Sequence, residues 1–227
     1  MKIDTTIPAE HLAVTTERDD YVIEICQNKR VLHIGATDYP FTEDKYKNGQ
    51  LLYAKLGDIV EDQIGIDNDE KSSAFLNKQN IKNSKIVVAD MNAVQELNFS
   101  PEVIIFGETL EHLMNLETSL ANLKKLMMPD TTMLISVPNA LSFQNFLYAI
   151  RRKELQHPDH SVAFTYKTLM QLLKKNKFEI TGFKFTFLDH TNAHELNWKG
   201  KISHALIRFF VKISPVFAPG LVVTVKK

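Results

Sequence analysis

Residues 103–113 read V-I-I-F-G-E-T-L-E-H-L. The first four side chains are apolar and mostly β-branched, which predicts a buried strand that ends at Gly107. Glu108, Glu111 and His112 follow that strand closely. Open α/β sheets bind their ligands at the carboxyl ends of their strands, so these three ionisable groups are candidates for a functional site. A solvated loop can have the same composition, and the neighbouring strands decide between the two interpretations.

On both sides of this stretch, predicted strands alternate with predicted helices. Strands are expected at 29–35, 63–67, 84–90, 101–106 and 132–137, and helices at 16–27, 50–60, 70–79, 116–128, 142–153 and 165–175. This alternation predicts βαβ units, which build a mainly parallel sheet with helices on both faces. Residues 36–48 are predicted to form a long polar loop. Two late strands, 178–188 and 221–226, are predicted to pair at one edge of the sheet.

The composition restricts the class of protein. A chain of 227 residues suffices for one α/β domain and is too short for two ordinary ones. Lys+Arg and Asp+Glu both number 27, and a net charge of zero argues against nucleic acid as a partner. The single cysteine, Cys26, cannot form an internal disulfide, and the polar N-terminus lacks the apolar core of a signal peptide. These features predict a cytoplasmic protein.

Three of the predicted strands end on residues that suit a ligand. Gly35 and Ala36 end the first strand in a turn that lets the backbone approach a ligand, with a purely structural turn as the alternative. Asp67 ends the second strand and suits a ribose diol, with an Asx turn or a helix cap as the alternative. Asp90 and Met91 end the third strand and suit an exocyclic amine and a flat ring, again with a helix cap as the alternative.

Together with the flanking sequence, these strand ends resemble the class I S-adenosylmethionine-dependent methyltransferases over residues 29–188. The resemblance is carried by V-L-H-I-G-A at 31–36, G-I-D-N-D at 65–69, V-V-A-D-M at 87–91, G-E-T-L-E-H-L at 107–113, L-K-K-L-M-M-P-D-T-T-M-L-I-S-V-P-N at 123–139 and H-P-D-H-S-V-A-F-T-Y-K-T-L-M-Q-L-L at 157–173. It implies an α/β, Rossmann-like methyltransferase fold with a seven-stranded, mainly parallel sheet whose last strand is antiparallel. The residues before this match predict an N-terminal arm and helix, 1–28. A single methyltransferase domain, 29–227, is expected to follow, with 140–164 and 189–218 as cap insertions on the acceptor side.

The same resemblance assigns S-adenosylmethionine to the strand ends. Gly35 and Ala36 are implied to pass under its methionine part, and Asp67 is implied to hold the ribose hydroxyls. Asp90 and the Met91 backbone are implied to meet the adenine. His33 stands where the family usually has an acid, and two glycines of the first motif are absent, so weakened or lost cofactor binding is an alternative. The full set of implied cofactor-binding residues is Gly35, Ala36, Asp67, Asn68, Asp90 and Met91.

The pattern E-x-x-E-H at 108–112 resembles two groups within this class, the ubiquinone-pathway O-methyltransferases and the small-RNA 2′-O-methyltransferases. In those groups the two Glu and the His bind a divalent metal, which a further His can complete. At this spacing Glu108, Glu111 and His112 can share one helix face, and two carboxylates with one imidazole suit Mg²⁺ or Mn²⁺. His160 is the first choice for a fourth ligand or an acceptor-binding residue, and His157 is the second. The alternative is a site without metal, in which the glutamates orient the cofactor pocket and His112 acts as a base or packs.

The predicted reaction is O-methyl transfer to a sugar, a glycan or a small polar acceptor, because the pattern resembles enzymes of bacterial polysaccharide biosynthesis. The alternatives are metal-independent N- or O-methylation of a small molecule, and a binding or scaffold protein that has lost catalysis. Residues 202–217 are apolar and aromatic, and no acid follows Lys199. This segment is expected to pack on the domain, form a homodimer face or contact an anionic membrane peripherally. His190 and His194 either line the acceptor side or lie in a solvated loop.

Overall fold

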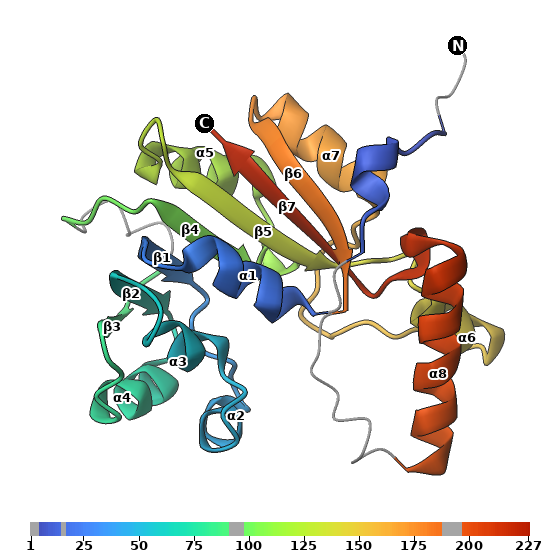
Figure 1. The fold of residues 1–227 in the computed structure, drawn as a ribbon, viewed down its shortest axis with the longest axis horizontal. Coiled ribbons are helices and arrows are strands. Elements are labelled where there is room, and N and C mark those ends of the chain that lie inside the picture. The colour runs from blue at the N-terminus through green and yellow to red at the C-terminus, as the bar shows by residue number, and fades with distance from the viewer. Residues whose placement is uncertain (1–4, 15–16, 91–97, 188–196) are drawn as a thin grey trace.

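The computed structural model describes residues 5–14, 17–90, 98–187 and 197–227. They contain a seven-stranded sheet with the strand order β3-β2-β1-β4-β5-β7-β6 (Figure 1). Neighbouring strands from β3 to β5 pair in parallel, whereas β7 lies antiparallel to both β5 and β6. The predicted sheet, mainly parallel with an antiparallel last strand, is confirmed. The strands are β1 (Arg30–Ile34), β2 (Asp62–Asp67), β3 (Ser84–Val88), β4 (Val103–Gly107), β5 (Thr132–Pro138), β6 (Glu179–Thr186) and β7 (Gly220–Lys226).

Helices cover both faces of this sheet, as the alternation of elements predicts. They are α1 (Arg18–Cys26), α2 (Thr42–Lys47), α3 (Leu52–Leu56), α4 (Glu70–Lys78), α5 (Leu116–Leu126), α6 (Phe143–Ile150), α7 (Tyr166–Lys175) and α8 (Trp198–Ile213), with the 3₁₀ turns η1 (Ala9–Leu12), η3 (Leu110–His112) and η4 (Pro215–Phe217). Side chains of a strand alternate between its two faces. In β4, Val103 and Ile105 share a core cluster with residues of α1 and α3, while Ile104 and Phe106 share another with residues of α5 and α7. β4 is therefore enclosed on both faces, and its carboxyl end is the part that can meet a ligand.

Two predicted elements differ from the structure. The predicted loop 36–48 contains α2, a polar helix whose first turn is acidic and whose last turn is basic. Such a charge distribution favours a helix through its dipole, although the apolar periodicity that predicts helices is absent. The helix predicted at 50–60 is confined to α3. The chain turns after α3, so that the Ile59 carbonyl accepts a hydrogen bond from the Asn28 amide just before β1.

The helices α6 and α8 lie side by side to one side of the sheet (Figure 1). Phe143 of α6 stacks on Phe210 of α8, with the ring centroids 3.9 Å apart. Among the described helices, none is both long enough and apolar enough to span a membrane.

Candidate active site

The two glutamates of the turn after β4 have different neighbours. Glu108 has a left-handed backbone, with φ of 48°, and the 3₁₀ turn η3 follows it. Glu108 Oε1 lies 3.8 Å from Arg18 Nη1 of α1, whereas Glu111 Oε1 lies 3.9 Å from His160 Nε2. The prediction that the E-x-x-E-H residues share one helix face is therefore wrong, because a positive φ and a 3₁₀ turn replace the expected α-helix.

Glu111 is almost completely enclosed. Its residue is 1% exposed, and neither carboxylate oxygen has a hydrogen-bond partner among the described residues. Burial raises the pKa of Glu111 to about 8, and the nearby Glu108 contributes to the same shift. A buried carboxyl group with this perturbed pKa, at the end of a central strand, is a candidate for a functional role.

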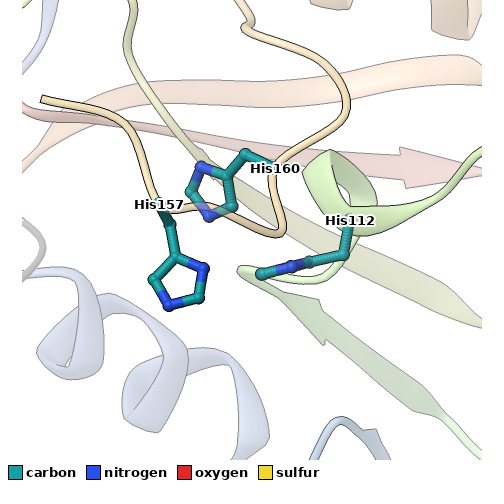
Figure 2. Close-up of side chains that lie close together, drawn as sticks. All are labelled: His112, His157 and His160. Carbon is teal, nitrogen blue, oxygen red and sulfur yellow. The ribbon is translucent and has the colours of Figure 1, made fainter. Parts of the chain in front are cut away.

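Three histidine rings gather in front of this turn (Figure 2). His112 belongs to η3, while His157 and His160 belong to the loop between α6 and α7. One ligand atom from each ring lies within 4.8 Å of the other two. Burial lowers the pKa of both His112 and His160, and the neighbouring rings lower both values further. The structure thus brings together His112 and the two histidines that the sequence offers as further ligands, and we call these three residues the histidine cluster.

A cleft runs across the carboxyl ends of the central strands, and we call it the strand-end cleft. Gly35 in its wall has φ of 72°, and a Cβ atom there would lie 2.8 Å from Thr109 Oγ1, so this turn requires glycine. Most of the predicted cofactor residues meet in this cleft together with two residues of the turn after β4. Its lining includes Gly35, Asp67, Asn68, Asp90, Glu108 and His112. Met91, His190 and His194 lie outside the described residues.

Asp67 organises the first turn from the end of β2. Its Oδ2 accepts a hydrogen bond from the Thr37 amide at 2.9 Å, and its Oδ1 accepts one from the Asp69 amide at 3.0 Å. The second contact is the Asx turn that the sequence offers as an alternative. The helix cap is a different residue, since Asp69 accepts the hydrogen bond from the Ser72 amide at the start of α4. A carboxylate oxygen has more than one lone pair, so Asp67 can make these contacts and still accept from a ligand hydroxyl.

Arg18 is a further residue of the candidate site, and the sequence pattern does not reveal it. It reaches from α1 into a cavity beneath the Gly35 turn, which it lines together with His33, Ala36 and Glu108. Burial and the nearby Arg18 lower the pKa of His33 to about 3, so His33 is neutral at pH 7. No local signal distinguishes Arg18 from other basic residues on helices, and the packing of α1 against the sheet is what brings it here.

A third cavity opens on the other side of the histidine cluster, and we call it the Asn139 cavity. Glu111, His157 and His160 line it, while His112 lines the strand-end cleft. The histidine cluster therefore lies at the boundary between the two hollows. The remainder of the wall combines apolar side chains with amides, including Pro138, Asn139, Gln144, Asn145, Gln156 and Val162.

A sheet of this order, with its cleft at the carboxyl ends of the parallel strands, defines the class of protein. It is a class I S-adenosylmethionine-dependent methyltransferase. The chain belongs to the Methyltransf_23 family, described as "Methyltransferase domain", whose model matches residues 21–182. No curated protein matches the sequence.

Solved structures share the fold at low sequence identity. A SAM-dependent methyltransferase from Archaeoglobus fulgidus is 19% identical with a TM-score of 0.55, and the match covers 92% of this chain and 90% of that one. The N-methyltransferase NodS from Bradyrhizobium japonicum WM9, in complex with S-adenosyl-L-homocysteine, is 11% identical with a TM-score of 0.58, covering 92% and 85%. A SAM-dependent methyltransferase from Aquifex aeolicus is 13% identical with a TM-score of 0.55, covering 92% and 88%. At these identities the likeness supports the fold, and the acceptor has to be argued from the site.

Proposed function

We propose that this cytoplasmic enzyme transfers the methyl group of S-adenosylmethionine to a hydroxyl oxygen of a sugar, a glycan or a small polar acceptor in polysaccharide biosynthesis. The observation that carries the proposal is the position of Glu111 and the histidine cluster between the strand-end cleft and the Asn139 cavity. A hydroxyl is a poor nucleophile until its proton is removed or its oxygen is held by an ion. This boundary supplies a buried carboxyl group and three imidazoles where donor and acceptor would meet.

The cofactor is assigned to the strand-end cleft and to the cavity beneath the Gly35 turn. Asp67 would offer lone pairs to the ribose hydroxyls, and Asn68 and Asp90, which line the same cleft, would face the adenosine. The methionine part carries one carboxylate and one ammonium group. Arg18 and Glu108, which lie in the cavity next to Gly35, offer the opposite charges.

The transfer breaks the S–CH₃ bond of the sulfonium and forms an O–CH₃ bond on the acceptor. The sulfonium becomes a neutral thioether, and the hydroxyl proton leaves the acceptor. The protein places the two reactants in line and activates the nucleophile. Activation has two routes in this site. His112 takes the proton as a base, or the histidine cluster holds a divalent ion that would polarise the hydroxyl, whose proton would then pass to solvent.

Calorimetry with S-adenosylmethionine tests the assignment of the cofactor. The native protein is expected to bind one equivalent, and Asp67→Asn should bind about 10- to 100-fold more weakly, because a hydrogen bond to a charged group contributes about 1.5–3 kcal/mol. Asp58→Asn is the control and should bind like the native protein, because Asp58 is exposed, precedes the amino end of β2 and lines neither hollow. Absence of binding by the native protein would overturn the enzyme proposal in favour of a scaffold.

Transfer of a labelled methyl group from S-adenosylmethionine to a panel of sugar nucleotides and glycans tests the acceptor class. An ether-linked methyl group is the expected product. Label found solely on acceptor nitrogen would favour the alternative N-methyltransferase. Full activity in the presence of a chelator would contradict activation of the hydroxyl by a metal ion.

We further propose that α6 and α8 carry an apolar face that docks on an anionic membrane surface, where a lipid-linked acceptor would lie. The exposed apolar residues of α8 recur every three or four positions, so they share one side of the helix. They are Trp198, Ile202, Leu206, Phe209 and Ile213. Phe146 and Ile150 on the neighbouring α6 are also more than half exposed.

Charge complementarity supports an anionic lipid surface as the occupant of this face. No acid follows Lys199 in the chain, and Lys201 and Lys212 also lie on α8. The basic run 151–153 directly follows α6. Apolar side chains bordered by basic ones are the pattern of a helix that lies in a membrane interface.

Co-sedimentation with lipid vesicles tests the docking. The protein is expected to pellet with vesicles that contain phosphatidylglycerol and to stay in solution with pure phosphatidylcholine. Phe209→Glu should abolish pelleting, while Met128→Glu, which changes an exposed apolar residue next to α5, should not. If the native protein does not pellet with anionic vesicles, and Phe209→Glu instead converts a dimer to a monomer in analytical ultracentrifugation, the face is a homodimer interface.

A further inference from the structure

We propose that His112, His157 and His160 together bind one divalent ion of the borderline transition-metal class, with Zn²⁺ as its representative. The inference deepens the proposed function, on which its catalytic role rests, because the ion would hold the acceptor hydroxyl. It differs from the Mg²⁺ or Mn²⁺ site that the E-x-x-E-H pattern suggests, both in its ligands and in the kind of metal.

The side chains that converge in front of η3 are three imidazoles. Among the described residues, the group whose ligand atoms approach one another is the histidine cluster. Glu108, which the pattern assigns to the metal, instead faces Arg18 across 3.8 Å. Three imidazole nitrogens suit Zn²⁺ and related ions, whereas Mg²⁺ prefers oxygen ligands. The donor set therefore does not fit a hard ion, and it does fit a borderline one.

The ligand atoms of the three rings lie slightly farther apart than in a closed zinc site. In a tetrahedral site with Zn–N bonds of about 2.0–2.1 Å, two nitrogens lie about 3.3 Å apart. The three ligand atoms lie within 4.8 Å of one another, so closure requires shifts of about 1.5 Å or less. Figure 2 shows the three rings around one space. His157 is exposed and His160 is half-buried, so a rotation of the outer His157 ring can make this adjustment without moving the core.

Backbone hydrogen bonds connect the two segments that carry the rings. The amides of Ser161 and Val162 donate hydrogen bonds to the Glu111 carbonyl at 2.8 and 3.2 Å. These contacts attach the loop of His157 and His160 to η3, which carries His112. The two segments that supply the ligands are therefore joined by the backbone itself, as a preorganised site requires.

The buried Glu111 carboxyl group lies next to one of the ligands, His160. Glu111 Oε1 lies 3.9 Å from His160 Nε2, and both carboxylate oxygens lack a hydrogen-bond partner among the described residues. Histidines that bind metals usually donate their second N–H to a carboxylate, which orients the ring. A small rotation of His160 would place Nε2–H on Glu111 and leave Nδ1 for the ion. This arrangement gives the buried Glu111 carboxyl group a partner.

With three protein ligands the ion keeps an open position. The histidine cluster borders the Asn139 cavity on one side and the strand-end cleft on the other, so an open position on the ion would lie next to the space where the acceptor oxygen and the methyl group are proposed to meet. A Lewis acid there would stabilise the alkoxide that forms as the hydroxyl loses its proton.

Calorimetric titration of the chelator-treated full chain with ZnCl₂, and separately with MgCl₂, tests the site. One equivalent of Zn²⁺ is expected to bind, and Co²⁺ at the same site should give the visible absorption of a tetrahedral complex. Glu111→Gln, which removes a supporting residue, should lower the affinity for Zn²⁺ about 10- to 100-fold. His157→Ala, which removes a ligand, should lower it by more than that. His157 is exposed, so its replacement should leave the protein folded.

The matched control is His204→Ala, which removes an imidazole on α8 outside the cluster and should leave Zn²⁺ affinity unchanged. Unchanged affinity in His157→Ala, or binding of Mg²⁺ without binding of Zn²⁺, would overturn the inference. Calorimetry with S-adenosylmethionine is run on the same samples. Cofactor binding without Zn²⁺ binding would contradict the metal site and leave the methyltransferase proposal intact. Zn²⁺ binding without cofactor binding would contradict the methyltransferase proposal and leave the metal site intact.

Discussion

At the scale of single residues, the site depends on two backbone conformations that few side chains adopt. Gly35 at the end of β1 and Glu108 after β4 both have positive φ. The two turns are in contact, because a Cβ atom at Gly35 would meet Thr109 Oγ1. Thr109 Oγ1 in turn donates a hydrogen bond to the Gly107 carbonyl at 2.8 Å. The shape of the strand-end cleft therefore depends on both turns at once.

Gly35→Ala is expected to lower the free energy of unfolding by about 1–2 kcal/mol from left-handed strain alone. The added methyl group should cost more by displacing Thr109. Gly49→Ala is the matched control, since Gly49 has φ of 66° and a Cβ atom there would meet nothing within 4 Å. Urea denaturation measures both variants. Equal losses in the two would show that the contact with Thr109 carries no cost.

At the scale of elements, α1 is attached to the domain by apolar packing and by a buried ion pair. Val22 and Cys26 belong to the core cluster on one face of the sheet. Asp19 lies 2.9 Å from Arg18 and 3.1 Å from Lys55 of α3. Burial alone would raise the pKa of Asp19, but Arg18 and Lys55 hold it below its ordinary value. The ionised form of Asp19 is thus the one that the folded state favours.

This lowered pKa predicts a pH dependence of stability. The unfolded chain takes up the proton near the ordinary value of about 3.9, before the folded chain does. The contribution of Asp19 is therefore fully present above about pH 4 and is lost as the pH falls further. In urea titrations, Asp19→Asn should be less stable at pH 7 and should lose less stability toward pH 3 than the native protein. Asp20→Asn, at the exposed neighbouring position, should keep the native slope, and a native slope in Asp19→Asn would contradict the prediction.

At the scale of the whole molecule, the proposed cofactor contacts come from segments that only the complete sheet assembles. Arg18, Gly35, Asp67 and Glu108 belong to four different elements or turns, and they surround two adjoining hollows. A ligand in these hollows binds the folded chain and has no site in the unfolded one. Cofactor binding is therefore coupled to the folding of the entire domain.

S-adenosylhomocysteine at 100 times its dissociation constant should raise the free energy of unfolding by about 2.7 kcal/mol. Thermal or urea denaturation with and without the ligand measures this increase. Asp67→Asn at the same ligand concentration should show a smaller increase. A ligand-independent midpoint in the native protein would contradict the assignment of both hollows to the cofactor.

The sequence by itself determined the sheet and the edge at which the site lies. Apolar runs such as 103–106 predict buried strands because both of their faces must be covered. Gly35 and Asp67 mark strand ends for equally local reasons. Gly35 adopts the positive φ of the turn after β1, and the Asp67 carboxylate accepts a hydrogen bond from the turn after the neighbouring strand. The polar helix α2 was missed, because charge distribution rather than apolar periodicity supports it.

The tertiary structure alone decided which side chains meet. A spacing of three or four residues predicts a shared helix face, yet the positive φ of Glu108 and the 3₁₀ turn η3 separate the two glutamates. His112 and His157 are 45 positions apart, and backbone hydrogen bonds to Glu111 bring their segments together. Arg18 enters the site through the packing of α1. Secondary structure follows from local patterns in the chain, whereas the convergence of side chains depends on turn conformations and on packing between distant segments.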